Sequence, residues 1–133
     1  MQHNQATKIL QLIQPDAYAH STAHAVEIDT SGFNACTIVL LCGLNDMQAA
    51  LTTCSLTEGD TSGSVTTAIN AATLGNAACV DAAGTAVPLS DTDDADCIVF
   101  HVNCVGRKKY LRLNATQADT NPSTVAAVAI LSR

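Results

Sequence analysis

Hydrophobic and polar residues alternate along much of this chain, with the period of two that is typical of β-strands buried on one face. Val26–Asp29 and Leu51–Thr57 follow this alternation, and Thr30–Gly32 supplies turn-forming residues after the first of them. Ala35–Cys42, in contrast, is apolar at nearly every position. Such a run predicts a central strand that is covered on both faces.

Further strand-like runs lie near the C-terminus, at Cys97–Cys104, Tyr110–Thr116 and Thr124–Leu131. Their close spacing predicts a β-meander, with a tight basic turn at Gly106–Lys109 between the first two runs. Val65–Ile69 predicts one more strand. About six to eight short strands separated by turn residues indicate an all-β sandwich or barrel, and we expect a single jelly-roll-like β-sandwich domain.

The first 24 residues differ from the rest of the chain in composition. They hold three of the four histidines and have few strand signals. Lys8–Ile13 fits either a short helix or an edge strand, which would stop at Pro15. We interpret residues 1–24 as an extended N-terminal arm and residues 25–133 as the β-sandwich domain.

Length and charge exclude several classes of partner. The chain has 133 residues, which fits one domain, and its net charge is −6. Four of its six basic residues lie between Arg107 and Arg112, and so small a basic patch on an acidic chain binds a phosphate backbone poorly. The longest apolar stretch, Ile38–Cys42, is too short to span a membrane. We therefore expect neither nucleic acid nor membrane as a partner.

The cysteines and the missing motifs argue against enzyme chemistry. None of the six cysteines forms a Cys-x-x-Cys pair, and the N-terminus does not resemble a secretory signal, so we expect an intracellular origin and reduced thiols. Gly59–Gly63 departs from a serine-protease nucleophile motif, because Thr61 stands between Asp60 and Ser62, and it is interpreted as a solvated loop. His20 and His24 would share a metal only on a helix, which their context disfavours. We predict no catalytic, metal or cofactor site.

Charged residues near the C-terminus are the candidate interface residues. Asp93, Asp94 and Asp96 crowd an acidic loop whose like charges repel, and a nearby cation would relieve that repulsion. The loop lacks the glycine and glutamate of an EF-hand, so solvation is favoured, and an irregular or intersubunit calcium site remains the alternative. The basic candidates are Arg107, Lys108, Lys109 and Arg112, which would pair with carboxylates of a neighbouring subunit or a partner.

The run Val105–Thr116, with its Gly-Arg-Lys-Lys-Tyr-Leu-Arg-Leu core, leads into an Ala/Val-rich last strand, and Ile28–Phe33 stands near the start of the domain. In these features the chain resembles the small decoration, or cement, proteins of tailed-bacteriophage heads. The resemblance implies a β-sandwich, often trimeric, that binds the outside of the capsid. There it would tie together neighbouring subunits of the major capsid protein.

Two functions of different classes follow from these observations. The first is a structural virion protein on the capsid exterior, whose partners are the major capsid protein and further copies of itself, with a trimer expected. The alternative is a receptor- or glycan-binding module of a phage tail or fibre. Aromatic residues make up only 3% of the chain, which disfavours glycan binding because sugar rings usually stack on tryptophan or tyrosine.

Overall fold

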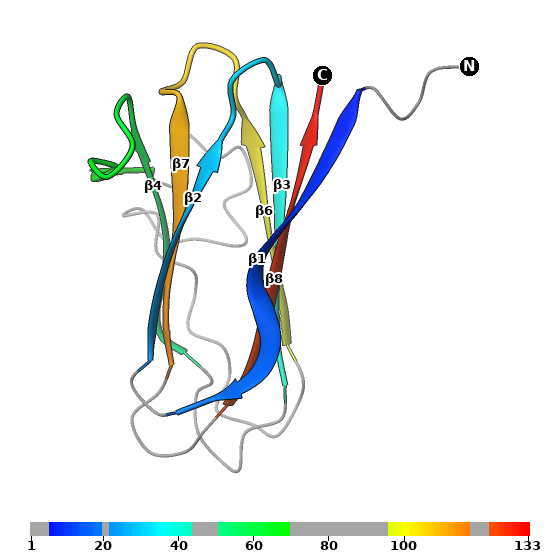
Figure 1. The fold of residues 1–133 in the computed structure, drawn as a ribbon, viewed down its shortest axis with the longest axis vertical. Coiled ribbons are helices and arrows are strands. Elements are labelled where there is room, and N and C mark those ends of the chain that lie inside the picture. Colours follow the sequence, from blue (N-terminus) through cyan, green and yellow to red (C-terminus); the bar gives the residue numbers. More distant parts are fainter. Residues whose placement is uncertain (1–5, 20–21, 44–50, 70–95, 118–122) are drawn as a thin grey trace.

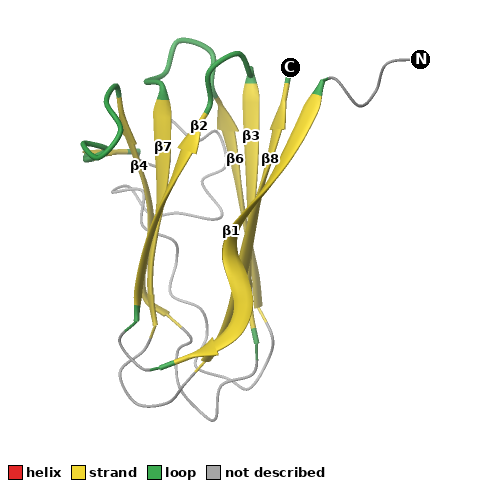
Figure 2. Ribbon diagram, in the orientation of Figure 1, coloured by secondary structure: helices red, strands yellow, loops and turns green. Residues whose placement is uncertain are grey.

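The computed structural model describes residues 6–19, 22–43, 51–69, 96–117 and 123–133. These residues form eight β-strands and no helix (Figure 2). The strands are β1 (Thr7–Tyr18), β2 (Ala23–Asp29), β3 (Ala35–Cys42), β4 (Leu51–Gly59), β5 (Thr67–Ala68), β6 (Asp96–Asn103), β7 (Tyr110–Gln117) and β8 (Ser123–Ser132).

The strands form two antiparallel sheets that face each other (Figure 1). One sheet has the order β1-β8-β3-β6 and the other has the order β2-β7-β4-β5. Eight strands in two four-stranded sheets of this order make a jelly roll. The predicted all-β, jelly-roll-like sandwich is therefore confirmed.

The predicted C-terminal meander is wrong, because β6, β7 and β8 are not neighbours in one sheet. β7 pairs with β2 and β4, whereas β8 returns to the sheet of β6 and pairs there with β1 and β3. The segment Cys104–Lys109 carries the chain across the gap of about 10 Å that separates packed sheets. A glycine-containing turn serves a hairpin or a crossing equally well, so the local sequence does not distinguish the two.

The predicted arm also needs correction. Residues 7–18 form β1, which pairs with β8 from Thr7 opposite Ser132 to Tyr18 opposite Ser123. The side chain of Ile13 is only 3% exposed, so this strand contributes to the core. The edge-strand alternative is thus the one observed, and the sandwich begins before residue 25. Pro15 lies within a register shift of this edge strand, where its missing N–H leaves the ladder intact.

The core lies between the sheets and is built mainly of aliphatic side chains. In the described part of the chain, Phe100 is the only aromatic residue among the buried hydrophobic side chains. Alanines at inward positions of β7 and β8 let the sheets approach closely, because they add little volume. The largest side chains that are fully buried with it include Ile28, Ile38, Leu40, Leu56, Leu111, Leu113 and Leu131.

β3 has the predicted bounds and lies between β8 and β6, so its central position is confirmed. Ile38 and Leu40 point into the core and are fully buried. On the opposite side of the strand, Val39 is half-buried and Leu41 is 51% exposed, so the described residues leave that face open. The prediction of a strand covered on both faces therefore holds for one face only.

Candidate protein-binding interface

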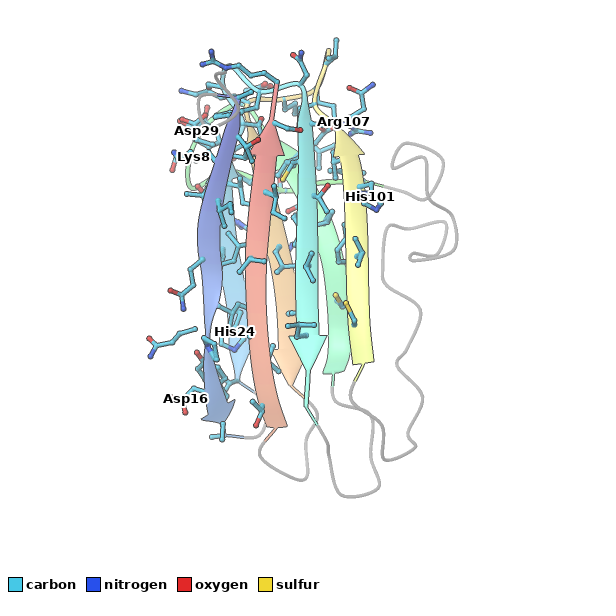
Figure 3. All side chains as sticks on the ribbon, turned by 90° about the vertical axis from the view of Figure 1, so that its right-hand side faces the viewer. Lys8, Asp16, His24, Asp29, His101 and Arg107 are labelled. Carbon is cyan, nitrogen blue, oxygen red and sulfur yellow. The ribbon has the colours of Figure 1, made fainter. Side chains whose placement is uncertain are left out.

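The two outer faces of the sandwich differ sharply in charge. Figure 3 views the sheet β1-β8-β3-β6 from outside, with β1 at one edge and β6 at the other. We define the uncharged face as the set of paired residues of these four strands whose side chains point away from the core. None of these residues is Asp, Glu, Lys or Arg. These positions are Thr7, Ile9, Gln11, Thr124, Ala126, Val128, Ile130, Ser132, Ala35, Thr37, Val39, Leu41, Cys97, Val99, His101 and Asn103.

The pairing register arranges these side chains in rows across the sheet. One row crosses the centre of the face through Val128, Val39 and Val99, beside Gln11. The row above it contains, from edge to edge, Ile9, Ile130, Thr37 and His101. Ile9 is 69% exposed and stands out at the β1 edge. The face therefore presents aliphatic rows to solvent, without a charge to keep them apart from another protein surface.

A groove opens on this face between β3 and β6, at the end opposite to Leu41. Its volume is about 270 Å³. Within it, Thr37 Oγ1 lies 3.2 Å from His101 Nδ1. The lining residues are Ala35, Cys36, Thr37, His101, Val102 and Asn103. Ala35 contributes only a methyl group to this lining.

The outer face of the sheet β2-β7-β4-β5 is polar instead. Arg112 on β7 donates to Glu27 on β2, with 2.5 Å between Nη2 and Oε1. The loop after β4 folds over this pair, because Ser62 Oγ donates to Glu27 Oε2 at 2.9 Å and Gly63 N donates to Glu27 Oε1 at 3.0 Å. The donors from Arg112 and then Ser62 hold the pKa of Glu27 below its usual value. Glu27 and Arg112 thus pair with each other on this face, although the buried Arg112 Nε has no hydrogen-bond partner among the described residues.

The other three predicted basic residues, Arg107, Lys108 and Lys109, follow β6 at the end of the sandwich where β2 leads to β3 and β6 leads to β7 (Figure 1). Each pairs with a carboxylate of its own chain. Arg107 Nη1 lies 3.1 Å from Glu58 Oε2, and both side chains are largely buried. We define the charged end as Arg107, Lys108, Lys109, Glu58, Asp60 and Asp29.

The two lysines of the charged end are held more loosely than Arg107. Lys108 Nζ lies 3.7 Å from Asp60 Oδ2, and Lys109 Nζ lies 3.9 Å from Asp29 Oδ2. Their side chains are 40% and 48% exposed. Exposed pairs at these distances contribute little to folding. The lysines can therefore exchange these partners for carboxylates of another protein.

The backbone beneath the charged end is tied together by long-range hydrogen bonds. Thr30 donates to the carbonyl of Lys109 from its amide at 3.0 Å and from its hydroxyl at 2.8 Å. Cys104 N donates to Asn34 O at 2.7 Å, which joins the two crossing loops. Gly106 has φ of 76°, a conformation that side-chain-bearing residues rarely adopt. The loops thus present Lys108 and Lys109 from a fixed backbone.

The acidic candidates are only partly described. Asp93 and Asp94 lie outside the described residues, and Asp96 begins β6, where its backbone pairs opposite Cys42. Arg107 follows the end of β6 that is opposite to Asp96. Arg112 pairs with Glu27. The structure brings the basic residues together with four carboxylates that the sequence did not single out.

The candidate histidine pair is only partly described, because His20 lies outside the described residues. His24 lies in the extended strand β2, with its ring 4.6 Å from the ring of Tyr18 in an edge-to-face contact. Among the described residues, no group of three or more His, Cys, Asp or Glu side chains is placed to hold a metal ion. The same residues contain no helix that is long and apolar enough to cross a membrane.

Sequence reasoning missed most of the uncharged face. The signal was present in Val125–Leu131, which is apolar at every position, as is most of Ala35–Cys42. Two adjacent strands that are apolar on both sides predict an outer apolar surface once they pair. That pairing between β3 and β8 joins segments far apart in the sequence. Ile9 and Val99 join the face only through the same long-range register.

No family model matches the chain, and no curated protein matches it. Three solved structures with which it aligns are the SPBc2 prophage-derived protein YomS, the CBM36-1 domain of a multidomain xylanase from the hindgut metagenome of Trinervitermes trinervoides, and CBM35 from Cellvibrio japonicus Abf62.

These three likenesses are distant. YomS is 10% identical with a TM-score of 0.46, over 93% of this chain and 92% of that one. The CBM36-1 domain is 9% identical with a TM-score of 0.46, over 93% and 95%. The CBM35 is 12% identical with a TM-score of 0.41, over 97% and 88%. At this level of similarity they carry no argument about function, and the jelly-roll assignment rests on the strand order.

Proposed function

We propose that this chain is a structural binding module that decorates the exterior of a tailed-phage head, where it binds the major capsid protein and stabilises contacts between capsid subunits. The observation that carries the proposal is the uncharged face. An aliphatic sheet surface with Ile9 and Leu41 more than half exposed is typical of a subunit that functions within a protein assembly. The resemblance of Val105–Thr116 to head decoration proteins supplies the particular assembly.

The charged end is the part of the surface that we assign to the capsid. Lys108 and Lys109 are exposed and loosely paired, while the backbone that carries them is fixed by Thr30 and Gly106. Rim charges of this kind steer association and set its salt dependence more than its final affinity. Attachment through them should weaken as ionic strength rises.

The test is a count of copies on assembled particles. Heads are purified from a lysate of the host that carries this gene, and the chain is quantified by mass spectrometry relative to the major capsid protein. A decoration protein gives a fixed, shell-like ratio and is released without opening the heads. Absence from purified heads contradicts the proposal. A handful of copies per particle, located on tails, would instead support the receptor- or glycan-binding alternative.

A further inference from the structure

We infer that the uncharged face packs against the same face of a second copy of this chain, about a two-fold axis parallel to the strands. In this arrangement Ile9 of each copy enters the groove that Thr37, His101, Ala35 and Asn103 line on the other. The inference concerns the chain's own oligomeric partner, and it does not depend on attachment to a capsid. It leaves the charged end at the rim of the pair.

The first argument is charge. Burying a charged group without a partner costs several kcal/mol, so whatever covers this face must itself be free of charge where the two meet. The polar outer face around Glu27 and Arg112 fails this condition. The charged end fails it too, with six ionised side chains. In the described part of the chain, the uncharged face is itself a surface without charge, so the same face of a second copy can cover it.

The second argument is shape. Ile9 protrudes at the β1 edge, and the groove lies at the β6 edge, where Thr37 and His101 line it and share the register row of Ile9. A two-fold axis parallel to the strands exchanges the β1 and β6 edges and leaves the height along the strands unchanged. Each Ile9 is thereby placed opposite the groove of the other copy. The groove, at about 270 Å³, has room for the side chain.

The same axis gives a sheet packing that proteins commonly use. Two faces related by it keep their strand directions within about 30° of each other, which is the aligned packing of β-sandwiches. The central row of Val128, Val39 and Val99 then meets its own copy across the axis. Branched aliphatic side chains interdigitate well in such contacts.

The area is sufficient for a specific pair. Four strands spaced about 4.8 Å apart and about eight residues long give a footprint near 500 Å², or about 1,000 Å² counted on both copies. This value lies at the lower limit for a biological interface. We therefore expect a dimer that dissociates on dilution to low micromolar concentration.

The face also favours a pair over the trimer that the resemblance implies. A patch that carries both the protruding Ile9 and its receiving groove is complementary to itself, and self-complementary patches make closed two-fold contacts. A three-fold ring needs two different patches on each subunit. The structure places both features on one face.

The first experiment places a charge at the centre of the face. Val39→Lys changes a half-buried outward residue of β3, and Ser55→Lys is the matched control at a half-buried outward position of β4 in the other sheet. Sedimentation velocity should give twice the 13.7 kDa chain mass for wild type and Ser55→Lys. Val39→Lys should raise the dissociation constant by at least about a hundredfold.

The second experiment reads the geometry directly and does not rely on a destabilising change. Ile9→Cys and His101→Cys are combined in a Cys97→Ser background. Within one chain these positions are three strands apart, about 14 Å, which is too far for a disulfide. Mild oxidation should therefore yield covalent dimers, whereas Ile9→Cys with Ser55→Cys should not.

The outcomes separate this inference from the proposed function. A monomeric or trimeric wild-type mass, or a dimer that Val39→Lys leaves intact, overturns the two-fold pairing. A dimer without Ile9–His101 cross-links refutes this axis. If the chain dimerises as described but is absent from heads, the pairing stands and the decoration function fails. If it decorates heads as a monomer, the reverse holds.

Discussion

Two neighbouring residues of β3 provide the most direct test of which face of that strand is core. Ile38 is fully buried and lies in register with Phe100 and Ala129, whereas Val39 is half-buried on the uncharged face. We expect the variants Ile38→Ala and Val39→Ala to differ strongly in stability. The comparison is sharp because the two positions are adjacent and share the same backbone hydrogen-bonding partners, β6 and β8.

The size of each loss follows from burial. Removing three carbons from a fully buried isoleucine costs 2–5 kcal/mol in general, and about 3–4 kcal/mol is expected for Ile38 because β3 is held on both sides and cannot collapse into the cavity. A buried methylene contributes about 0.8 kcal/mol, so losing two methyl groups from the half-buried Val39 should cost less than about 1 kcal/mol. For a chain of 133 residues, Ile38→Ala should lower Tm by about 10–15 °C.

Urea denaturation followed by far-ultraviolet circular dichroism measures both losses, and it suits a chain that has no tryptophan. The measurement is made over a range of protein concentrations, because pairing of folded chains adds stability by mass action. Ile38→Ala should lose the same free energy at every concentration. Val39→Ala should lose mainly the part that depends on concentration. Equal losses for the two variants, or a larger loss at Val39 in dilute protein, would refute the assignment of inner and outer faces.

Three further predictions concern the other sheet and the thiols. Gly59→Ala should destabilise the fold by about 2 kcal/mol in thermal unfolding, because the added Cβ would lie 2.3 Å from the backbone of the following turn; a neutral effect would contradict the packing of that turn. Hydrogen bonds from Arg112 lower the folded-state pKa of Glu27, so its contribution is complete above the usual value of 4.5 and is lost as pH falls through the lowered value. Glu27→Gln should flatten the decline of the urea midpoint below about pH 4.5, and an unchanged acid profile would exclude Glu27 as its source. In protein diluted below the concentration at which two copies pair, iodoacetamide at pH 8 should modify the exposed Cys97 and leave Cys36 intact, because burial raises the pKa of the Cys36 thiol to about 12; peptide mapping that finds both modified at equal rates would show that β3 opens readily.

Local pattern was enough to find most strands, because alternation and apolar runs report directly on burial within a strand. Ala35–Cys42 was predicted with the bounds of β3, and the runs that became β6, β7 and β8 were found within a few residues. The spatial order of those strands was not found. Sheet membership depends on pairings such as β1 with β8, which join the two ends of the chain, and no local signal encodes them.

The same limit explains what was found and missed at the surface. The basic residues were recognised because they are consecutive, but their partners lie far away in sequence. Arg107 pairs across 49 residues with Glu58, and Arg112 pairs across 85 residues with Glu27. The arm was assigned from polar composition, yet an edge strand needs few core residues, and Ile13 with Leu10 and Leu12 was sufficient. An edge strand can look like an arm for that reason.

The two surfaces of this sandwich should respond in opposite ways to salt, and this sets the order of assembly we expect. Contacts between aliphatic rows on the uncharged face gain from salts that strengthen burial, and they contain no ion pair to be screened. Contacts made by Lys108 and Lys109 at the charged end are ionic, and salt screens them over a Debye length of about 8 Å at physiological ionic strength, so they weaken as salt rises. At a salt concentration that makes attachment of the pair to its larger partner reversible, the pairing of the two copies would therefore persist. A pair also presents two charged ends on one rigid unit, so each weak attachment raises the effective concentration of the other. This is a route by which loosely paired lysines, worth little singly, hold a small protein on a larger assembly.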